Sequence, residues 1–195
     1  MNTPNKLTIA RMIATPVFLA ALLIQFPYHY LVALVLFIAA SHTDMIDGKM
    51  ARKYNLVTDF GKFLDPLADK MLTTSAFLGF IFMYAGTKYC WQLTVITFVV
   101  LFREFMVSSL RLVVLSSGGK VVAANMWGKL KTVTQMAGII FAIFAYVLVG
   151  DFGIASVKPV MDAIIAVLFW VSTVLCVISG GIYLVACKDF IDPTK

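Results

Sequence analysis

Charged side chains are scarce in this sequence. Only 13% of its 195 residues are Asp, Glu, Lys or Arg, whereas 61% are hydrophobic. A soluble domain has about 25% charged and roughly 45–50% apolar residues. The balance found here excludes a soluble globular domain, a disordered chain and a fibrous protein, and it predicts an integral membrane protein.

The sequence also has few cysteines and no signal-peptide cleavage site. The three cysteines, Cys90, Cys176 and Cys187, have no paired spacing, so neither a disulfide framework nor a zinc site is expected. No small-residue cleavage site follows the first apolar run, and we expect the first helix to be retained. Residues 31–40 and 139–149 are continuously apolar, without the alternation of a membrane β-barrel, so helices are favoured.

Six apolar segments have about the 20 residues that a membrane-spanning helix needs. We expect them at 12–26, 30–49, 60–85, 91–115, 130–149 and 160–187, after a short N-terminal interfacial segment over 1–11. The sequence therefore predicts an all-α, polytopic membrane protein with six transmembrane helices, in which residues 1–195 form a single domain.

The Lys and Arg residues predict the orientation. With the N-terminus in the cytoplasm, the outer loops contain only Lys88 and Lys158 of the 16 basic residues. Basic residues concentrate on the cytoplasmic side of membrane proteins. We therefore expect a multi-pass protein of the cell membrane with both termini in the cytoplasm. The same rule accounts for the net charge of +6 without nucleic acid as a partner.

Half of the 10 acidic residues lie between residues 44 and 69. Asp44 and Asp47 end the second expected span, and Asp65 and Asp69 begin the third, with each pair on one helix face. The two spans join on the cytoplasmic side, so the four carboxylates can converge there. Carboxylates at this depth are costly unless they are paired or functional. Hard oxygen ligands favour Mg²⁺, Mn²⁺ or Ca²⁺, so the pattern predicts a divalent-metal site open to a phosphate-bearing ligand.

The residues between these acids favour a phosphate ligand. Gly48 and Gly61 have no side chain to block the approach of a ligand to the backbone. Arg52 can bind a phosphate oxygen through two N–H groups. Asp59 lies outside this pattern, and we expect it to cap the third span together with Thr58.

One segment of the chain reads Asp44-x-x-Asp47-Gly48-x-x-Ala51-Arg52, then eight residues, then Gly61-x-x-x-Asp65-x-x-x-Asp69. This segment resembles the signature of the CDP-alcohol phosphotransferase family at all eight positions. The resemblance implies transfer of a phosphatidyl or phospho group from a CDP-linked donor to a hydroxyl, with release of CMP. It implies that two divalent ions, Mg²⁺ or Mn²⁺, are held by the four aspartates, with Asp69 also the general base.

The same resemblance implies a homodimer and a set of residues that bind CDP: Gly48, Ala51, Arg52 and Gly61. Asn5 either contacts the nucleotide or follows Pro4 in a turn, and the sequence favours neither interpretation.

The second half of the chain is expected to bind the acceptor. Glu104, Ser108 and Arg111 share a face of the fourth span, whereas the adjacent Arg103 and Glu104 are not expected to face each other. Structural pairing with neighbouring helices is an equally good interpretation of Arg103 and Glu104. Four cations near the cytoplasmic side can form an acceptor-phosphate pocket, and a plain positive-inside role is the alternative for them: Arg111, Lys120, Lys129 and Lys131.

Residues 103–111 and 123–135, together with residues 4–11, resemble the bacterial phosphatidylglycerophosphate synthase branch of the family. This resemblance implies CDP-diacylglycerol as donor, glycerol 3-phosphate as acceptor and phosphatidylglycerophosphate as product, in phospholipid biosynthesis. One alternative is the same chemistry with phosphatidylglycerol, serine or inositol phosphate as acceptor. The other is a divalent-cation transporter, although transporters usually place acids near the midplane, often in repeated halves, and this chain has one acidic cluster.

Overall fold

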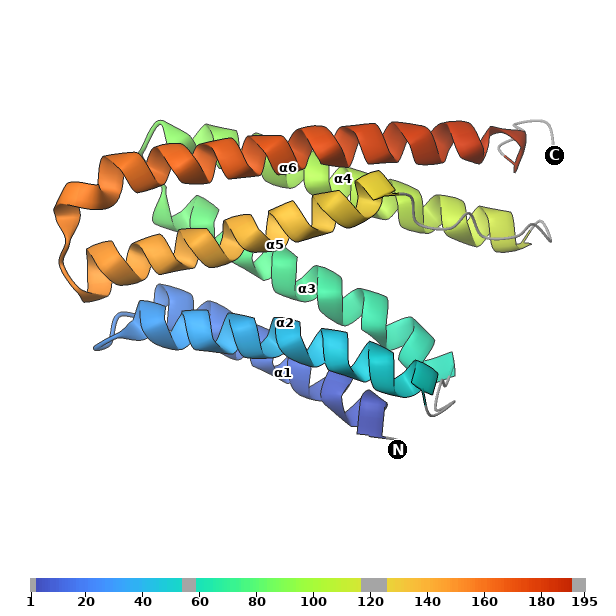
Figure 1. Ribbon diagram of the computed structural model, residues 1–195, viewed down its shortest axis with the longest axis horizontal. Coiled ribbons are helices and arrows are strands. Elements are labelled where there is room, and N and C mark those ends of the chain that lie inside the picture. The colour runs from blue at the N-terminus through green and yellow to red at the C-terminus, as the bar shows by residue number, and fades with distance from the viewer. Residues whose placement is uncertain (1–2, 54–58, 117–125, 191–195) are drawn as a thin grey trace. The chain divides into compact units, whose positions relative to one another are not determined.

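The computed structural model describes the backbone of residues 3–53, 59–116 and 126–190, and the side chains of residues 5–43, 61, 64–115, 126–188 and 190. This part of the chain is helical and contains no strand, which confirms the all-α prediction for it (Figure 1). Its α-helices are α1 (Thr3–Leu23), α2 (His29–Lys53), α3 (Asp59–Met83), α4 (Tyr89–Ser116), α5 (Met126–Tyr146) and α6 (Lys158–Ala186). Shorter helices are the π-helix η1 (Val147–Asp151) and the 3-10 helices η2 (Ala155–Val157) and η3 (Lys188–Phe190).

Three segments of the described chain are long and apolar enough to cross a membrane, namely Asn5–Leu23, Met126–Asp151 and Ala155–Ala186. A shorter apolar helix covers His29–Thr43. Helices α3 and α4 have 25 and 28 residues but carry several charged side chains. The helices therefore have the character of a membrane protein, and the number of six spans stays a prediction.

The N-terminal region differs from the prediction. An interfacial segment was expected over residues 1–11, but α1 runs unbroken from Thr3, and its apolar stretch begins at Asn5. A helix lying on a membrane surface exposes its polar residues. Asn5, Thr8 and Arg11 are instead at most 6% exposed, because α1 packs against α2 and α3. The polar start of α1 is therefore part of the protein interior.

The chain divides into two compact units. Unit 1 consists of Met1–Thr87 and Ile139–Ala163, and unit 2 consists of Lys88–Gly138 and Ile164–Lys195. Helices α5 and α6 each have one part in unit 1 and the other part in unit 2. The single domain expected from the sequence stays a prediction.

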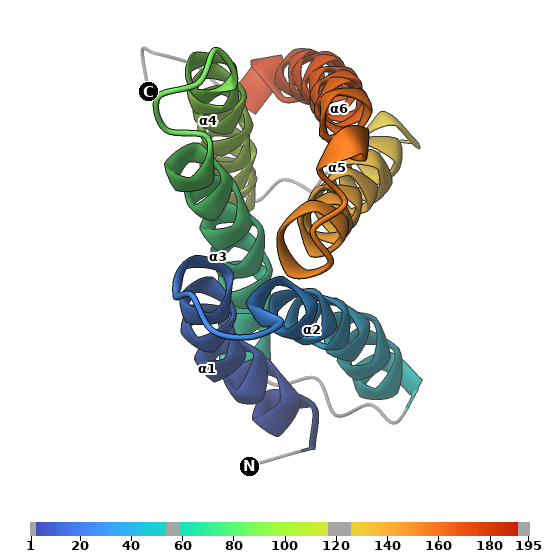
Figure 2. The ribbon, with the colours of Figure 1, turned by 90° about the vertical axis from the view of Figure 1, so that its left-hand side faces the viewer.

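In unit 1, α1 and α3 run in the same direction (Figure 1) and pack against each other (Figure 2). The Thr8 hydroxyl donates to Asp65, 57 residues further along the chain, near the start of both helices. Towards their other ends, Leu22 packs on Gly79 with the same separation in sequence. The register is therefore constant over 14 residues, or about 21 Å of helix. This register places the first turns of α1 level with Asp65.

The opposite end of unit 1 is held by polar and aromatic contacts. The Tyr84 hydroxyl donates to Oδ1 of Asp162 over 2.6 Å, and the Lys158 ammonium lies 5.5 Å from the centre of the Tyr84 ring. The backbone N–H of Leu31 donates to the Asp151 carboxylate at the end of η1 over 2.8 Å. Asp65 and Tyr84 are separated by about 28 Å of helix rise, close to the ~30 Å hydrocarbon thickness of a bilayer. Polar contacts thus lie near both ends of α3.

In unit 2, α4 and α6 also run in the same direction. Arg103 contacts Ser179, and about one turn later Val107 packs in a buried cluster with Tyr183. Helix α5 approaches α6 closely at Gly138, where a Cβ would crowd the Phe169 ring. The Arg103 and Val107 contacts thus bring the middle of α4 against α6, and Gly138 lets α5 pack against α6.

Candidate active site

The signature residues lie on two consecutive helices of unit 1 that contact each other, α2 and α3. Gly61, Asp65 and Asp69 lie in the first three turns of α3. The others lie in the last turns of α2, and their side chains are outside the described residues: Asp44, Asp47, Gly48, Ala51 and Arg52. The backbone thus places the two halves of the signature at the connected ends of α2 and α3.

Asp65 and Asp69 are half-buried and lie one turn apart on one face of α3. Pro66 lies between them, inside the helix. A proline lacks the backbone N–H of a helical hydrogen bond and restricts the residue before it, here Asp65. The Asp65 carboxylate is also bound by another helix, because Oδ1 accepts a hydrogen bond from the Thr8 hydroxyl of α1 over 2.7 Å.

Helix α1 presents a buried polar face. Asn5, Thr8, Arg11 and Thr15 are separated by three, three and four residues, so they lie on one side of the helix, and each is at most 6% exposed. Asn5 lies inside α1, so its interpretation as a turn residue is wrong. No role is predicted for Thr8 from the sequence. The helical spacing of these polar residues in an apolar segment was the signal that could have found it.

The described donors fit a hard divalent cation. Asp65 and Asp69 offer carboxylate oxygens, which suit Mg²⁺, Mn²⁺ or Ca²⁺. Among the side chains that the structure describes, no group of three or more His, Cys, Asp or Glu comes together. The expected site therefore requires Asp44 and Asp47 in addition to the described pair on α3.

Lys131, expected to bind the acceptor phosphate, lies in an ion network of unit 2. It is 5% exposed, and its Nζ lies 2.6 Å from Oε1 of Glu104. The same oxygen accepts Nη1 of Arg103 over 3.0 Å, and Nη2 of Arg103 donates to Ser179 over 2.9 Å. Pairing with neighbouring helices is therefore confirmed for Arg103 and Glu104. The expectation that these two do not face each other is wrong, because the long arginine side chain reaches the carboxylate of the next residue.

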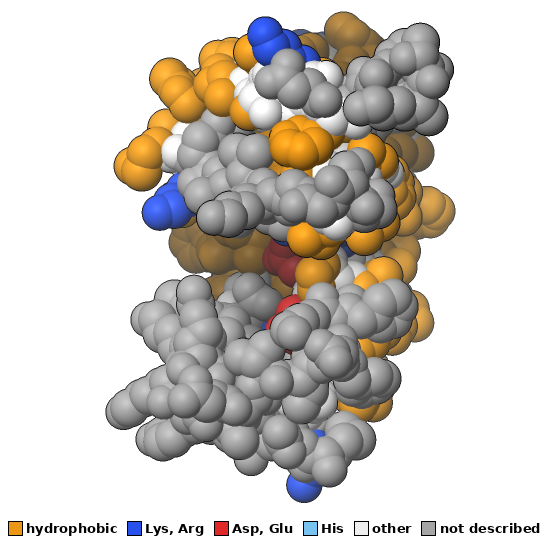
Figure 3. Space-filling model, turned by 90° about the vertical axis from the view of Figure 1, so that its right-hand side faces the viewer, with side chains coloured by type: hydrophobic (Ala, Val, Ile, Leu, Met, Phe, Trp, Pro, Cys, Tyr) orange, Lys and Arg blue, Asp and Glu red, His pale blue; other side chains and the backbone are white. Residues whose placement is uncertain are grey.

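The other expected acceptor cations have a different environment. Arg111 on α4 and Lys129 on α5 are exposed, and Lys120 lies outside the described residues. Lys129 and Lys131 are two residues apart and so point to different sides of α5. Figure 3 shows described Lys and Arg side chains in blue beside hydrophobic surface in orange. The expected set thus divides into one buried, paired lysine and two exposed cations.

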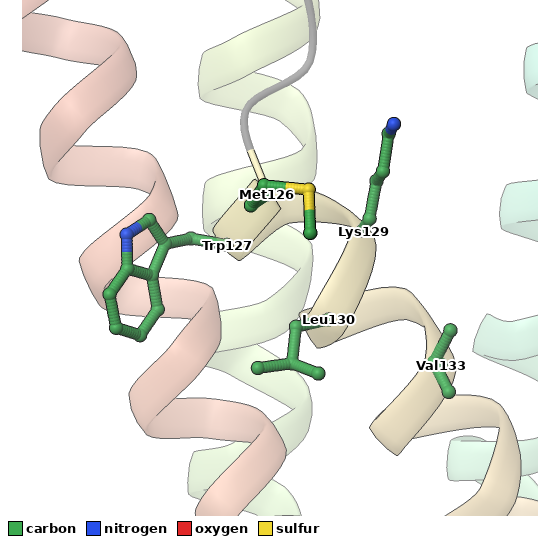
Figure 4. A pocket seen from close by; sticks show the side chains of 5 residues that line it. All are labelled: Met126, Trp127, Lys129, Leu130 and Val133. Atoms are coloured by element: carbon green, nitrogen blue, oxygen red, sulfur yellow. The ribbon is translucent and has the colours of Figure 1, made fainter.

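A surface pocket of about 380 Å³ lies along the first turns of α5 (Figure 4). Its described lining residues are Met126, Trp127, Lys129, Leu130 and Val133. The Trp127 and Lys129 side chains point in different directions, so the lysine stands beside an otherwise apolar wall. Neither Asp65 nor Asp69 lines this pocket.

Comparison with known proteins identifies the family. Residues 1–180 match the family model of CDP-alcohol phosphatidyltransferases. The chain is 45% identical over 150 residues to the CDP-diacylglycerol–glycerol-3-phosphate 3-phosphatidyltransferase of Bacillus subtilis (strain 168), which covers 71% of this chain and 74% of that protein. The protein of the same name from Rickettsia bellii (strain RML369-C) is 38% identical over 193 residues, 97% of each chain.

A third protein of that name, from Yersinia pestis (strain Pestoides F), is 33% identical over 141 residues, 72% of this chain and 75% of that protein. The family as a whole is generally dependent on divalent cations, in agreement with the carboxylate pattern on α2 and α3. The match over residues 1–180 and the complete signature lead to one conclusion: the chain belongs to the CDP-alcohol phosphatidyltransferase family.

Proposed function

We propose that this protein transfers the phosphatidyl group of CDP-diacylglycerol to glycerol 3-phosphate, forming phosphatidylglycerophosphate and CMP. The observation that carries the proposal is the complete eight-residue signature on α2 and α3. The relatives named for this reaction, one of which aligns with 97% of the chain, support the choice of donor and acceptor. Membership in a transferase family favours this function over the cation-transporter interpretation.

Asp44, Asp47, Asp65 and Asp69 would hold two divalent cations, Mg²⁺ or Mn²⁺. The half-buried carboxylates of Asp65 and Asp69 on one face of α3 support this assignment. Bound divalent cations neutralise the negative charge of a pyrophosphate and stabilise the departing CMP.

Asp69 acts as the general base in this proposal. Its carboxylate accepts the proton of the acceptor hydroxyl while the hydroxyl oxygen bonds to the phosphorus of the phosphatidyl group. The bond between that phosphorus and the bridging oxygen breaks, and CMP leaves with the electron pair. An aspartate is a weak base in water, so Asp69 contributes mainly through its position beside the acceptor hydroxyl.

The donor nucleotide is proposed to bind at the same end of unit 1. Gly48, Ala51 and Gly61 would leave room for the cytidine, and Arg52 would contact a phosphate oxygen. Asn5 lies one turn before Thr8, whose hydroxyl bonds Asp65, and this position supports a contact with the nucleotide.

The acceptor phosphate is proposed to bind the cations Arg111, Lys120 and Lys129, with Lys131 adding its charge from the Glu104 network. The exposure of Arg111 and Lys129 supports this role, because both can exchange water for a phosphate. Glu104 and Arg111 lie seven residues, or two turns, apart on the same face of α4.

The proposal places the protein in the cell membrane as a homodimer, with six spans and with both termini and the active site on the cytoplasmic side. The distribution of Lys and Arg along the sequence supports this orientation. The long apolar segments of α1, α5 and α6 support the membrane location.

A direct assay tests this function. The purified protein receives CDP-diacylglycerol, Mg²⁺ or Mn²⁺ and one candidate acceptor at a time, and the release of CMP and the lipid product are measured. We expect phosphatidylglycerophosphate with glycerol 3-phosphate, loss of activity with EDTA, and recovery with excess cation. No CMP with any acceptor contradicts the transferase, whereas release with serine, inositol phosphate or phosphatidylglycerol but not glycerol 3-phosphate contradicts the acceptor assignment.

A further inference from the structure

Helix α1 carries none of the eight signature residues, yet it contacts one of them. The hydroxyl of Thr8 donates to Oδ1 of Asp65 over 2.7 Å, and Thr8 is 1% exposed. A carboxylate has two oxygens, so a bond at Oδ1 leaves Oδ2 to offer to a cation. The contact therefore reaches a proposed metal ligand from outside its own helix.

The position of Thr8 is well defined by packing. Phe18 and Leu22, further along α1, are completely or almost completely buried, and Leu22 rests on Gly79 of α3. This contact and the Thr8 bond set one register between the two helices. Threonine is branched at Cβ and has few rotamers in a helix, so the Thr8 hydroxyl has little freedom once α1 is docked.

Thr15 provides a natural comparison within the same helix. It is also 1% exposed, but its hydroxyl bonds the backbone carbonyl of Arg11, one turn earlier, over 2.9 Å. This local bond is the common arrangement for threonine inside a helix. Thr8 bonds across to another helix, so the two threonines differ in what their hydroxyls contact and hardly at all in burial.

Asp65 has a particular need for such support. It precedes Pro66, which interrupts the backbone hydrogen bonding of α3 and disfavours helical geometry at the residue before it. Helix α3 alone therefore defines the orientation of this carboxylate less well than an uninterrupted helix would. A hydrogen bond from a docked neighbouring helix compensates for this.

We propose that Thr8 is a positioning residue whose hydroxyl holds the Asp65 carboxylate in the orientation that binds the divalent cation. This inference rests on the proposed metal site. Thr8 does not touch the cation itself and acts through Asp65. Loss of a hydrogen bond to a metal ligand typically lowers metal affinity by about 10–100-fold, and this is the effect expected of removing the hydroxyl.

The test compares three single variants of the full-length protein in detergent. Thr8→Val removes the hydroxyl and keeps the shape, Thr8→Ser keeps the hydroxyl, and Thr15→Val is the matched control. Binding of Mn²⁺ without substrate is measured from the electron paramagnetic resonance signal of the free ion, and the half-maximal Mn²⁺ concentration for CMP release is measured separately. Thr8→Val should weaken Mn²⁺ binding by about 10-fold or more. Thr8→Ser should restore most of the affinity, and Thr15→Val should bind as the wild type does.

The outcomes separate a failure of the Thr8 positioning role from a failure of the proposed function. If the wild type binds Mn²⁺ and releases CMP but Thr8→Val matches it within about twofold, the role of Thr8 is wrong and the proposed function stands. A wild type that neither binds Mn²⁺ nor releases CMP overturns both. Circular dichroism verifies the fold of each variant, and if Thr8→Val does not fold, Thr8→Ala is compared with Thr8→Ser by the same criteria.

Discussion

Replacing Glu104 by Gln should destabilise unit 2, because the Glu104 carboxylate binds two basic side chains, Lys131 and Arg103. Its Oε1 lies 2.6 Å from Nζ of Lys131 and 3.0 Å from Nη1 of Arg103. The side chains of Lys131 and Arg103 are only 6% and 15% exposed. Water therefore screens their repulsion weakly once the negative charge is removed.

The size of the effect follows from this geometry. Two nitrogens that share one oxygen at these distances lie within about 5.6 Å of each other, and two unit charges at that distance repel by about 3 kcal/mol at an effective dielectric constant near 20. Removal of one member of a buried ion pair costs about 3–5 kcal/mol, and the partial exposure of Glu104 favours the lower value. A loss of about 3 kcal/mol lowers the melting temperature of a chain of this size by roughly 6–12 °C.

Thermal unfolding in detergent, followed by circular dichroism, measures this loss. The double variant Glu104→Gln/Lys131→Met removes the repulsion together with the carboxylate, so it should be more stable than Glu104→Gln alone. Lys131→Met completes the double-mutant cycle. A Glu104→Gln protein that melts within about 2 °C of the wild type, or a double variant whose loss equals the sum of the single losses, would refute the network as a source of stability.

Two further predictions concern unit 1. Tyr84→Phe removes the 2.6 Å hydrogen bond to the Asp162 carboxylate and should cost about 1.5–3 kcal/mol in chemical unfolding. Gly150→Ala should cost about 1–3 kcal/mol because a Cβ there overlaps the Tyr30 ring. Gly181→Ala is the control, because a Cβ there meets open space inside α6, and it should not lower the melting temperature.

The helices could be predicted largely from the sequence because a chain in lipid must satisfy its backbone hydrogen bonds within continuous apolar helices. Helices α2 to α6 accordingly coincide with the expected spans to within a few residues. Helix α1 was misplaced because the polar residues Asn5, Thr8 and Arg11 resemble a surface segment. Their burial depends on the docking of α1 against α2 and α3, which the sequence does not specify.

For the candidate site, the sequence predicts features that are local to one helix but not contacts between helices. The spacing of Asp65 and Asp69 predicts that they share one face of α3, because that relation is local to a helix. The bond between Thr8 and Asp65 was not predictable, because it depends on the parallel register of two helices 57 residues apart in sequence. The pairing of Lys131 with Glu104 was likewise not predictable, because it depends on how two helices distant in sequence pack together.

The proposed function depends on the signature aspartates, which would bind the metal ions for phosphatidyl transfer. The most direct test measures CMP and phosphatidylglycerophosphate from CDP-diacylglycerol and glycerol 3-phosphate, with wild-type protein and Asp69→Asn side by side. We expect equimolar products from the wild type with Mg²⁺ or Mn²⁺. The rate of Asp69→Asn should be at least about 100-fold lower, with much of the CDP-lipid binding retained. Equal rates for the two proteins, or no product from the wild type, would contradict the proposed function.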